Sequence, residues 1–409
     1  MYTDFNSPHR ENTVRFPTIL LLVPLAVSGA SCAEPVAPIA SANVHPRGAL
    51  DNSRIRFETG KGHVAFLGGS ITEMEGYRPM VCDILKKRFP KCEFTFTNAG
   101  ISSTCSTTGA FRLAADVLAK GPVDLLFVEF AVNDDQDAGH ARRECIRGME
   151  GIVRHVRTHN PAADIVVTHF VNEGMLKEFA AGRTPLAVAA HEAVAEHYRV
   201  PTIDLAKEVG ERIAASKLTW NEYGGVHPAR PGNALCAALI AGLMEGAWKD
   251  PAPKAKVDHA FPKKPLDDGN YESGRFLAID KAKVEKSWTA EVPDWKKIPG
   301  ECRGRFAKAT LLTATAPGAE LSLAFEGRTV GAYVLAGPDA GIVEASVDGG
   351  AFVAVDLYHR FSGGLHYPRT VVFATDLPPG KHTLTLRIAE KKSPKRTGTA
   401  ARVLQFVAN

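Results

Sequence analysis

The chain has 409 residues, of which 45% are hydrophobic and 23% charged, and its formal net charge at pH 7 is +4. This composition is that of a soluble globular protein, and the length favours two domains over one. Its basic residues form no run or stripe that would follow a nucleic-acid backbone, so we expect no nucleic-acid partner.

The N-terminus has the pattern of a secretory signal. Basic residues precede an apolar run at 16–28, and small residues follow at 29–33. We therefore predict a signal peptide at 1–33, a cut before Glu34, and a secreted or periplasmic protein. The apolar run is shorter than the roughly 20 residues that a bilayer requires, so no membrane span is expected in the mature chain. Cys32 leaves open a lipoprotein anchored at that residue.

Seven cysteines, at positions 32, 82, 92, 105, 145, 236 and 302, include no CxxC pair and show no metal-ligand spacing. If Cys32 leaves with the signal, six remain in an oxidising compartment, where one or two disulfides can form. Cys145 and Cys236 fall in helical patterns and also fit small buried side chains.

Between residues 61 and 249, short apolar runs alternate with helical patterns. Strands are predicted at 63–67, 93–97, 123–130, 164–168 and 200–204, and helices at 77–89, 110–118, 144–159, 186–198 and 233–248. Such alternation indicates an α/β fold in which helices cover both faces of a parallel sheet. A lead-in segment at 34–60 precedes this domain.

The pattern changes near residue 250. A Pro/Lys-rich linker is predicted at 250–268, and short strands follow at 321–325, 329–335, 342–347, 369–373 and 382–387. Gly-rich turns and period-two alternation predict an all-β, jelly-roll-like sandwich at 269–409. This domain either binds glycan through aromatic side chains or is a packing or spacer domain; the candidate side chains are Trp288, Trp295, Tyr333, Tyr358, His359 and Tyr367.

Ser70 follows the first predicted strand directly. Gly68 and Gly69 precede it and a helical segment comes after it, which favours a tight turn at the carboxyl edge of the sheet. Ligands bind at this edge in open α/β sheets, and a backbone N–H at the start of a helix suits an oxyanion. By itself the same serine also fits an ordinary helix cap.

Four short blocks appear in chain order, at 68–72 (Gly-Gly-Ser-Ile-Thr), 98–103 (Asn-Ala-Gly-Ile-Ser-Ser), 132–134 (Val-Asn-Asp) and 224–228 (Gly-Gly-Val-His-Pro). Through them the region from about 60 to 248 resembles the SGNH (GDSL-like) hydrolase superfamily, whose fold is flavodoxin-like. The first block and the appended sandwich resemble bacterial carbohydrate O-acetylesterase members.

The resemblance implies a role for each block. Ser70 would be the nucleophile and His227 its base, while backbone N–H groups of Ser70 and Ser103 and the Asn133 amide would bind the oxyanion. Ser103 stands where the superfamily has a glycine. Cys105 would be a neighbour of the site, not a nucleophile.

One departure concerns the histidine. The superfamily often has an aspartate three residues before it, and here that position is Gly224. Either a backbone carbonyl orients His227, as in a Ser-His dyad, or another carboxylate does so. Glu222 is closest in sequence and Asp134 is a possible support.

Other polar residues fit the site less specifically. Glu192 and Asp204 can orient the histidine only if the fold brings them near it. Glu129 and Arg112 are either a buried pair that supports the site or exposed side chains. We infer no cofactor and no metal, because there is no P-loop, no dinucleotide fingerprint and no metal-ligand spacing.

Together these patterns predict an exported serine esterase that removes O-acyl groups, acetyl in the first instance, from carbohydrate. The alternatives are a lipid or thioester acyl hydrolase of the same superfamily, and an inactive hydrolase-fold protein that binds glycan.

Overall fold

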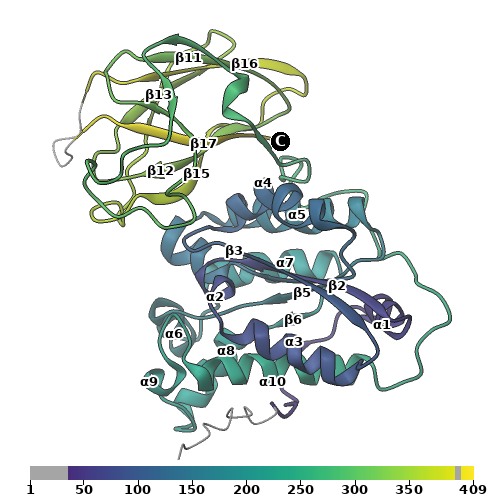
Figure 1. Cartoon of the computed structure of the whole chain (residues 1–409). Helices are drawn as coiled ribbons and strands as arrows, with labels where there is room; N and C mark the ends of the chain where they lie inside the picture. Colours follow the sequence, from purple (N-terminus) through teal and green to yellow (C-terminus); the bar gives the residue numbers. More distant parts are fainter. Residues whose placement is uncertain (1–35, 392–397) are drawn as a thin grey trace, which may run out of the picture. The chain divides into compact units, whose positions relative to one another are not determined.

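A mostly parallel β-sheet is the frame of the first half of the chain (Figure 1). The computed structural model describes residues 36–391 and 398–409. In this sheet the strand order is β1-β6-β5-β4-β2-β3, and only β1 runs antiparallel to its neighbour. The predicted signal peptide, with Cys32, lies outside the described residues.

The strands of this sheet are β1 (Val44–His45), β2 (Lys61–Gly68), β3 (Glu93–Gly100), β4 (Leu125–Glu129), β5 (Asp164–Thr168) and β6 (Thr202–Ile203). The helices around it are α1 (Asp51–Glu58), α2 (Ser70–Glu73), α3 (Tyr77–Arg88), α4 (Ser106–Asp116), η1 (Leu118–Lys120), the π-helix η2 (Asn133–Ala138), α5 (Arg142–His159), α6 (Glu173–Ala180), α7 (Leu186–His197), α8 (Leu205–Ala214), α9 (Trp220–Tyr223) and α10 (Arg230–Ala247).

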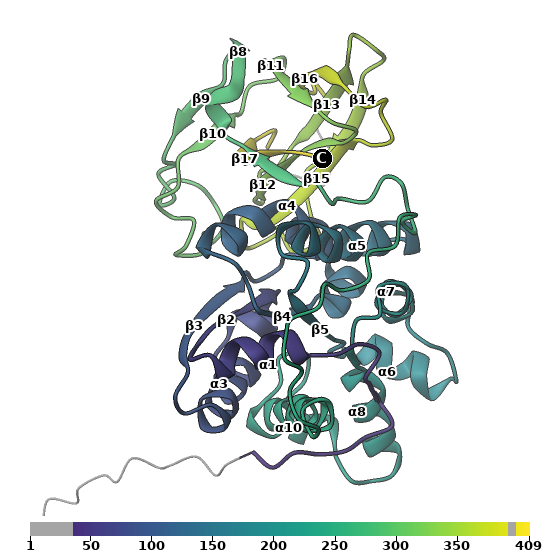
Figure 2. The same ribbon diagram turned by 90° about the vertical axis from the view of Figure 1, so that its right-hand side faces the viewer.

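Helices cover both faces of the sheet, as its apolar strands require. Successive side chains of a strand point to opposite faces. Phe66 of β2 therefore packs in a cluster with residues of α3 and α10, whereas Leu67 packs in another with residues of α4 and α5. Figure 2 shows these two helix layers on either side of the strands.

Three strands of the sheet end at the same level. Gly68, the last residue of β2, pairs with Gly100 of β3 and with Glu129 of β4. The segments that follow them, which include α2, the loop 101–105 and η2, therefore start at one carboxyl edge, where open α/β sheets bind ligands.

The second half of the described chain is an antiparallel β-sandwich. Its strands are β7 (Arg275–Leu277), β8 (Ala282–Lys286), β9 (Thr289–Glu291), β10 (Leu311–Ala314), β11 (Glu320–Glu326), β12 (Val330–Ala336), β13 (Ile342–Val347), β14 (Val353–Asp356), β15 (Tyr367–Ala374), β16 (Lys381–Ile388) and β17 (Ala401–Ala408), with a short 3-10 helix η3 (Ile279–Lys281). One sheet has the order β15-β12-β17-β10-β9 with β7 beside β17, and the other has β14-β13-β16-β11-β8. Their inner faces share one apolar core.

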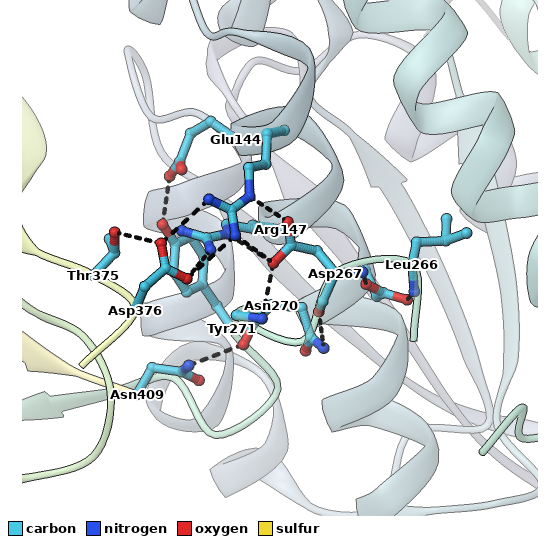
Figure 3. Close-up of polar contacts among 12 residues, drawn as sticks. Glu144, Arg147, Leu266, Asp267, Asn270, Tyr271, Thr375, Asp376 and Asn409 are labelled. Atoms are coloured by element: carbon cyan, nitrogen blue, oxygen red, sulfur yellow. Dashed lines mark hydrogen bonds and ion pairs between the residues drawn. The ribbon is translucent and has the colours of Figure 1, made fainter. Parts of the chain in front are cut away.

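The sandwich packs directly on α4 and α5. Phe111 of α4 belongs to the same apolar cluster as Tyr333 and Val407 of the sandwich. Arg147 of α5, which is 3% exposed, lies between the carboxylates of Asp267 and Asp376 (Figure 3). The exposed Arg143 pairs with the same two carboxylates. The two halves are therefore joined by shared core and by an ion network around the buried Arg147.

The structure confirms the predicted fold class, an α/β sheet followed by an all-β sandwich. Strand β5 coincides with its predicted range, whereas α4 begins at Ser106, four residues before the predicted 110. The sequence analysis missed the central strand β17, because it is buried on both faces and lacks period-two alternation.

The six cysteines of the described residues are all free thiols, of which Cys82, Cys105, Cys145 and Cys236 are buried. Disulfides among them are therefore not formed. In the described part of the chain, no helix has the length and apolar character to cross a membrane.

Candidate active site

Ser70 and His227 meet at the carboxyl edge of the parallel sheet. Ser70 begins α2, with only Gly69 between it and the end of β2, and His227 lies in the loop between α9 and α10. The Nε2 atom of His227 is 2.7 Å from Ser70 Oγ. A hydroxyl held against an imidazole nitrogen is the arrangement of a nucleophile with its base.

Gly224 explains the missing aspartate. Its φ is +102°, a conformation that favours glycine, and a Cβ there would overlap the backbone nitrogen of Ala229. The turn that delivers His227 therefore excludes any side chain at this position.

Glu222 and Asp134 do not contact the imidazole of the site. Glu222 forms a capping box with Thr219, which starts α9. Asp134 is buried and accepts hydrogen bonds from the backbone and hydroxyl of Ser106 and from His191 Nε2, at 2.7–2.8 Å. Burial raises the pKa of Asp134, but hydrogen bonds from the histidines around it outweigh burial and hold the pKa below its ordinary value. Its contacts tie α4 to α7 and η2.

The two more distant carboxylates are also engaged elsewhere. Glu192 accepts from His169 Nε2 at 2.7 Å and pairs with Arg47. Asp204 caps α8 by accepting the backbone N–H of Lys207 at 3.0 Å. Within the described residues, none of the carboxylates weighed from the sequence orients His227.

Asn133 lies beside the nucleophile turn. Its side chain is buried, and a Cβ at Gly69 would overlap its Oδ1 atom. The glycine before Ser70, where the superfamily usually has aspartate, therefore leaves room for the Asn133 amide. Nδ2 donates one hydrogen bond to Asp137 Oδ2 at 2.6 Å, which leaves its second N–H for another acceptor.

Asp137 is the carboxylate that contacts the Asn133 amide. Burial raises its pKa, and hydrogen bonds from Asn133 and Gln136 oppose that effect, as do the charges of Arg360 and His227. Asp137 therefore holds the Asn133 amide and lies within electrostatic reach of the imidazole. Sequence reasoning missed it, although it lies four residues after Asn133.

Ser103 has a backbone conformation that favours glycine, the residue that the superfamily has at this position. Its φ is +71°, in the left-handed region. Arg303 donates to Ser103 Oγ and to the Ser102 carbonyl, both at 2.8 Å, and the Tyr367 hydroxyl donates to the Ser103 carbonyl at 3.2 Å. No acceptor for the Ser103 backbone N–H is found within the described residues. Arg303 and Tyr367 come from the second half of the chain. The sequence singled out Tyr367 only as a candidate for glycan binding, and no sequence signal pointed to Arg303.

Glu129, the last residue of β4, supports the turn that carries Ser70. Its Oε1 accepts the backbone N–H of Gly69 at 2.8 Å and the hydroxyl of Thr72 at 2.7 Å. Burial raises the pKa of this carboxyl to about 7. Arg112 is also buried but donates instead to the carbonyls of Gly68 and Ala99, at 2.9 and 2.7 Å. Both residues are therefore buried and support the site, as one of the two interpretations of the sequence predicted. They do so through separate hydrogen bonds and not as a pair.

A cavity of about 310 Å³ lies beside Ser103, between the α/β part and the sandwich. Its walls carry mainly polar side chains, among them Ser103, Asp137, His140, Glu144, His359, Tyr367 and Arg369. Of the aromatic residues weighed for glycan binding, Trp288 lies in the sandwich core and Tyr333 in the cluster shared with α4, and they are 5% and 4% exposed. Only His359 and Tyr367 of that set line this cavity, where their rings stack.

A group of possible metal ligands includes two residues of the cavity wall, Cys105 and His140. Cys105, Asp134 and His140 place ligand atoms within 4.8 Å of one another, and so do Asp134, Cys145 and His191. The Asp134 carboxylate is already satisfied by Ser106 and His191. The Nδ1 atoms of His140 and His191 are buried without a hydrogen-bond partner among the described residues. Cys105 lines the cavity as a neighbour of the site.

Comparisons with known proteins agree with this geometry. Residues 66–235 match the model of the GDSL-like Lipase/Acylhydrolase family. Two solved structures of a two-domain esterase (CEX) active on acetylated mannans, one of them co-crystallised with mannopentaose, are similar in fold, with TM-scores of 0.71 and 0.70 at 23% sequence identity. Each match covers 89% of this chain and 96% of that chain. None of the curated protein sequences compared matches this chain.

The family match spans β2 to the first turns of α10, and so includes Ser70, Ser103, Asn133 and His227. Residues 66–235 are therefore similar to the GDSL-like lipase/acylhydrolase family, whose members are carboxylic ester hydrolases.

Proposed function

We propose that this protein is an exported serine esterase that removes O-acetyl groups from a carbohydrate through a Ser70–His227 dyad. The observation that carries the proposal is the 2.7 Å contact between Ser70 Oγ and His227 Nε2 at the carboxyl edge of the sheet. The signal-like sequence at 1–33 supports export.

The dyad would work by acyl transfer. His227 takes the Ser70 proton as Oγ attacks the ester carbonyl, and then returns that proton to the leaving alcohol of the sugar. A water molecule, deprotonated by the same imidazole, next attacks the acetyl-serine; as the bond to Oγ breaks and acetate leaves, the imidazolium returns the proton to Ser70 Oγ.

The negative charge of each tetrahedral intermediate needs hydrogen-bond donors. Three are at hand: the backbone N–H of Ser70 at the start of α2, the backbone N–H of Ser103, and the Asn133 N–H that Asp137 leaves free. Donors held in place before the reaction stabilise the charge without reorganising.

Two observations support a carbohydrate substrate. The cavity beside Ser103 combines polar and charged side chains with an aromatic pair and Val355, Val371 and Val372, a mixed lining that suits the hydroxyl groups and the apolar ring faces of a sugar. The similar two-domain esterase acts on acetylated mannans, and the likeness extends over both halves of this chain.

The test is a comparison of esters and variants. Wild type, Ser70→Ala and His227→Ala would be assayed on p-nitrophenyl acetate, on longer p-nitrophenyl esters and on acetylated mannan and xylan. We expect wild type to cleave acetate esters and to release acetate from at least one glycan, with both variants reduced by about 10³-fold or more.

Other outcomes would refute the proposal. Preference for long acyl chains would favour a lipid hydrolase, and wild type that binds a glycan without cleaving any ester would favour an inactive binding protein.

A further inference from the structure

The loop at 101–104, which carries the proposed oxyanion donor Ser103, is held by the sandwich as well as by its own domain. Arg303 reaches it from the segment between β9 and β10 and donates to two successive residues, at the Ser102 carbonyl and at Ser103 Oγ. Tyr367, the first residue of β15, donates to the Ser103 carbonyl. The two peptide units that flank the Cα atom of Ser103, one of which contains the donor N–H, are thus held by residues of the sandwich.

A second contact ties the same loop to the nucleophile helix. Glu73, three residues after Ser70 in α2, accepts the Ser102 backbone N–H at 2.8 Å and also its hydroxyl. Arg305 of the sandwich half bridges Glu73 Oε1 and the Gly100 carbonyl, each at 3.3 Å. The loop, α2 and the sandwich therefore form one connected polar unit.

Ser103 needs such support because of its conformation. Its φ of +71° is unfavourable for a non-glycine residue, and the residue keeps it only where surrounding contacts outweigh that cost. In the described chain, the hydroxyl and carbonyl of Ser103 bond only to Arg303 and Tyr367.

The supporting residues are themselves anchored in the sandwich. Tyr367 is 3% exposed and stacks on His359, with 4.1 Å between ring centroids. The segment that carries Arg303 is held by Phe306, which is buried in the shared core, and by backbone bonds from Glu301 to the 364–366 loop. The loop is therefore attached to a packed part of the molecule.

We propose that Arg303 and Tyr367 of the sandwich are positioning residues for the esterase reaction: they hold Ser103 in its left-handed conformation so that its backbone N–H faces the oxyanion. On this account the sandwich contributes to the geometry of the active site and is not only a packing or spacer domain. The inference rests on the function proposed above, because it assigns a role in that reaction.

The experiment measures kcat and KM on p-nitrophenyl acetate, an ester with no sugar to occupy the cavity. Variants are Arg303→Ala, Arg303→Lys and Tyr367→Phe. Asp376→Ala is the matched control, since it also removes a contact across the boundary, to Arg147, but does not touch the loop. Melting temperature is recorded for each.

We expect Arg303→Ala to lower kcat about 10- to 100-fold with KM unchanged, and Tyr367→Phe to have a smaller effect of the same kind. Arg303→Lys, which keeps one donor, should recover part of the loss. Asp376→Ala should lower the melting temperature and leave kcat within about twofold of wild type.

A double variant tests the conformational argument directly. Glycine adopts the left-handed conformation without strain, so Ser103→Gly should reduce the kcat penalty of Arg303→Ala. An additive double variant would contradict the argument.

The inference is wrong if wild type is active and the Arg303 and Tyr367 variants match it in kcat, or if they lose activity only on acetylated glycan, which would assign them to substrate binding. Wild type without activity on any ester would refute the proposed function itself, and this inference with it; that result is visible before any variant is made.

Discussion

At the scale of single residues, the account depends on two positions that are glycine for steric reasons. Gly69 leaves room for the Asn133 amide, and Gly224 allows the turn that delivers His227. The residues that set this protein apart from the usual superfamily pattern are therefore part of how its site is built.

Gly224→Ala should destabilise the protein far more than Gly225→Ala. Both residues have positive φ, but a Cβ at Gly225 meets no atom within 4 Å, whereas one at Gly224 overlaps Ala229. We expect about 1 kcal/mol for Gly225→Ala and about 3 kcal/mol or more for Gly224→Ala in urea unfolding. Equal losses would contradict the steric account. Gly224→Asp should likewise lose stability and gain no activity.

Glu222→Ala should leave catalysis intact. Because the Glu222 carboxylate binds Thr219 in a capping box, its removal should lower stability slightly. We expect kcat and its pH profile on p-nitrophenyl acetate to match wild type. A shift in the pH profile would show that Glu222 acts on His227 after all.

Glu129 should make stability depend on pH. Burial raises the pKa of its carboxyl from 4.5 to about 7, so between these values the folded protein binds more protons than the unfolded chain and stability falls as pH rises. The loss should reach about 3 kcal/mol above pH 7. Urea unfolding of Glu129→Gln, which keeps the shape without the titration, should give a flatter profile over the same range. A profile as steep as wild type would refute this assignment.

At the scale of elements, the π-helix η2 orients Asn133, one of the three proposed oxyanion donors. Its wide turn brings Asp137 Oδ2 to 2.6 Å from Asn133 Nδ2. We expect Asn133→Ala to lower kcat about 10²- to 10³-fold, and Asp137→Ala to lower it less, because only the orientation of the amide is lost. An Asp137→Ala variant with wild-type kcat would show that the amide needs no such partner.

Much of the candidate site at the edge of the sheet was predictable from the sequence. Ser70 and Asn133 follow apolar strands directly, so their meeting at one sheet edge follows from strand order and polarity. Glu222 was weighed as an orienting group because of its closeness to His227, although the pattern Thr219-x-x-Glu222 is itself the sequence mark of a capping box. Arg303 could not be predicted, because it lies some 200 residues from Ser103 and belongs to no motif.

At the scale of the whole described molecule, the two halves share an apolar cluster and the network around Arg147. We therefore expect a single cooperative unfolding transition by calorimetry. Arg147→Met should lower its midpoint, because it leaves Asp267 and Asp376 with only the exposed Arg143 as their cation. Two separate transitions in wild type would show that the halves unfold independently, contrary to this account.

The central claim is that Ser70 carries the acyl group, and trapping that group tests it most directly. After rapid mixing of wild type with p-nitrophenyl acetate and acid quenching, peptide mass spectrometry should find one acetyl group on the peptide that contains Ser70. His227→Ala should accumulate far less of it and Ser70→Ala none. Steady ester turnover with no acetyl group on Ser70, or turnover that survives Ser70→Ala, would contradict the account.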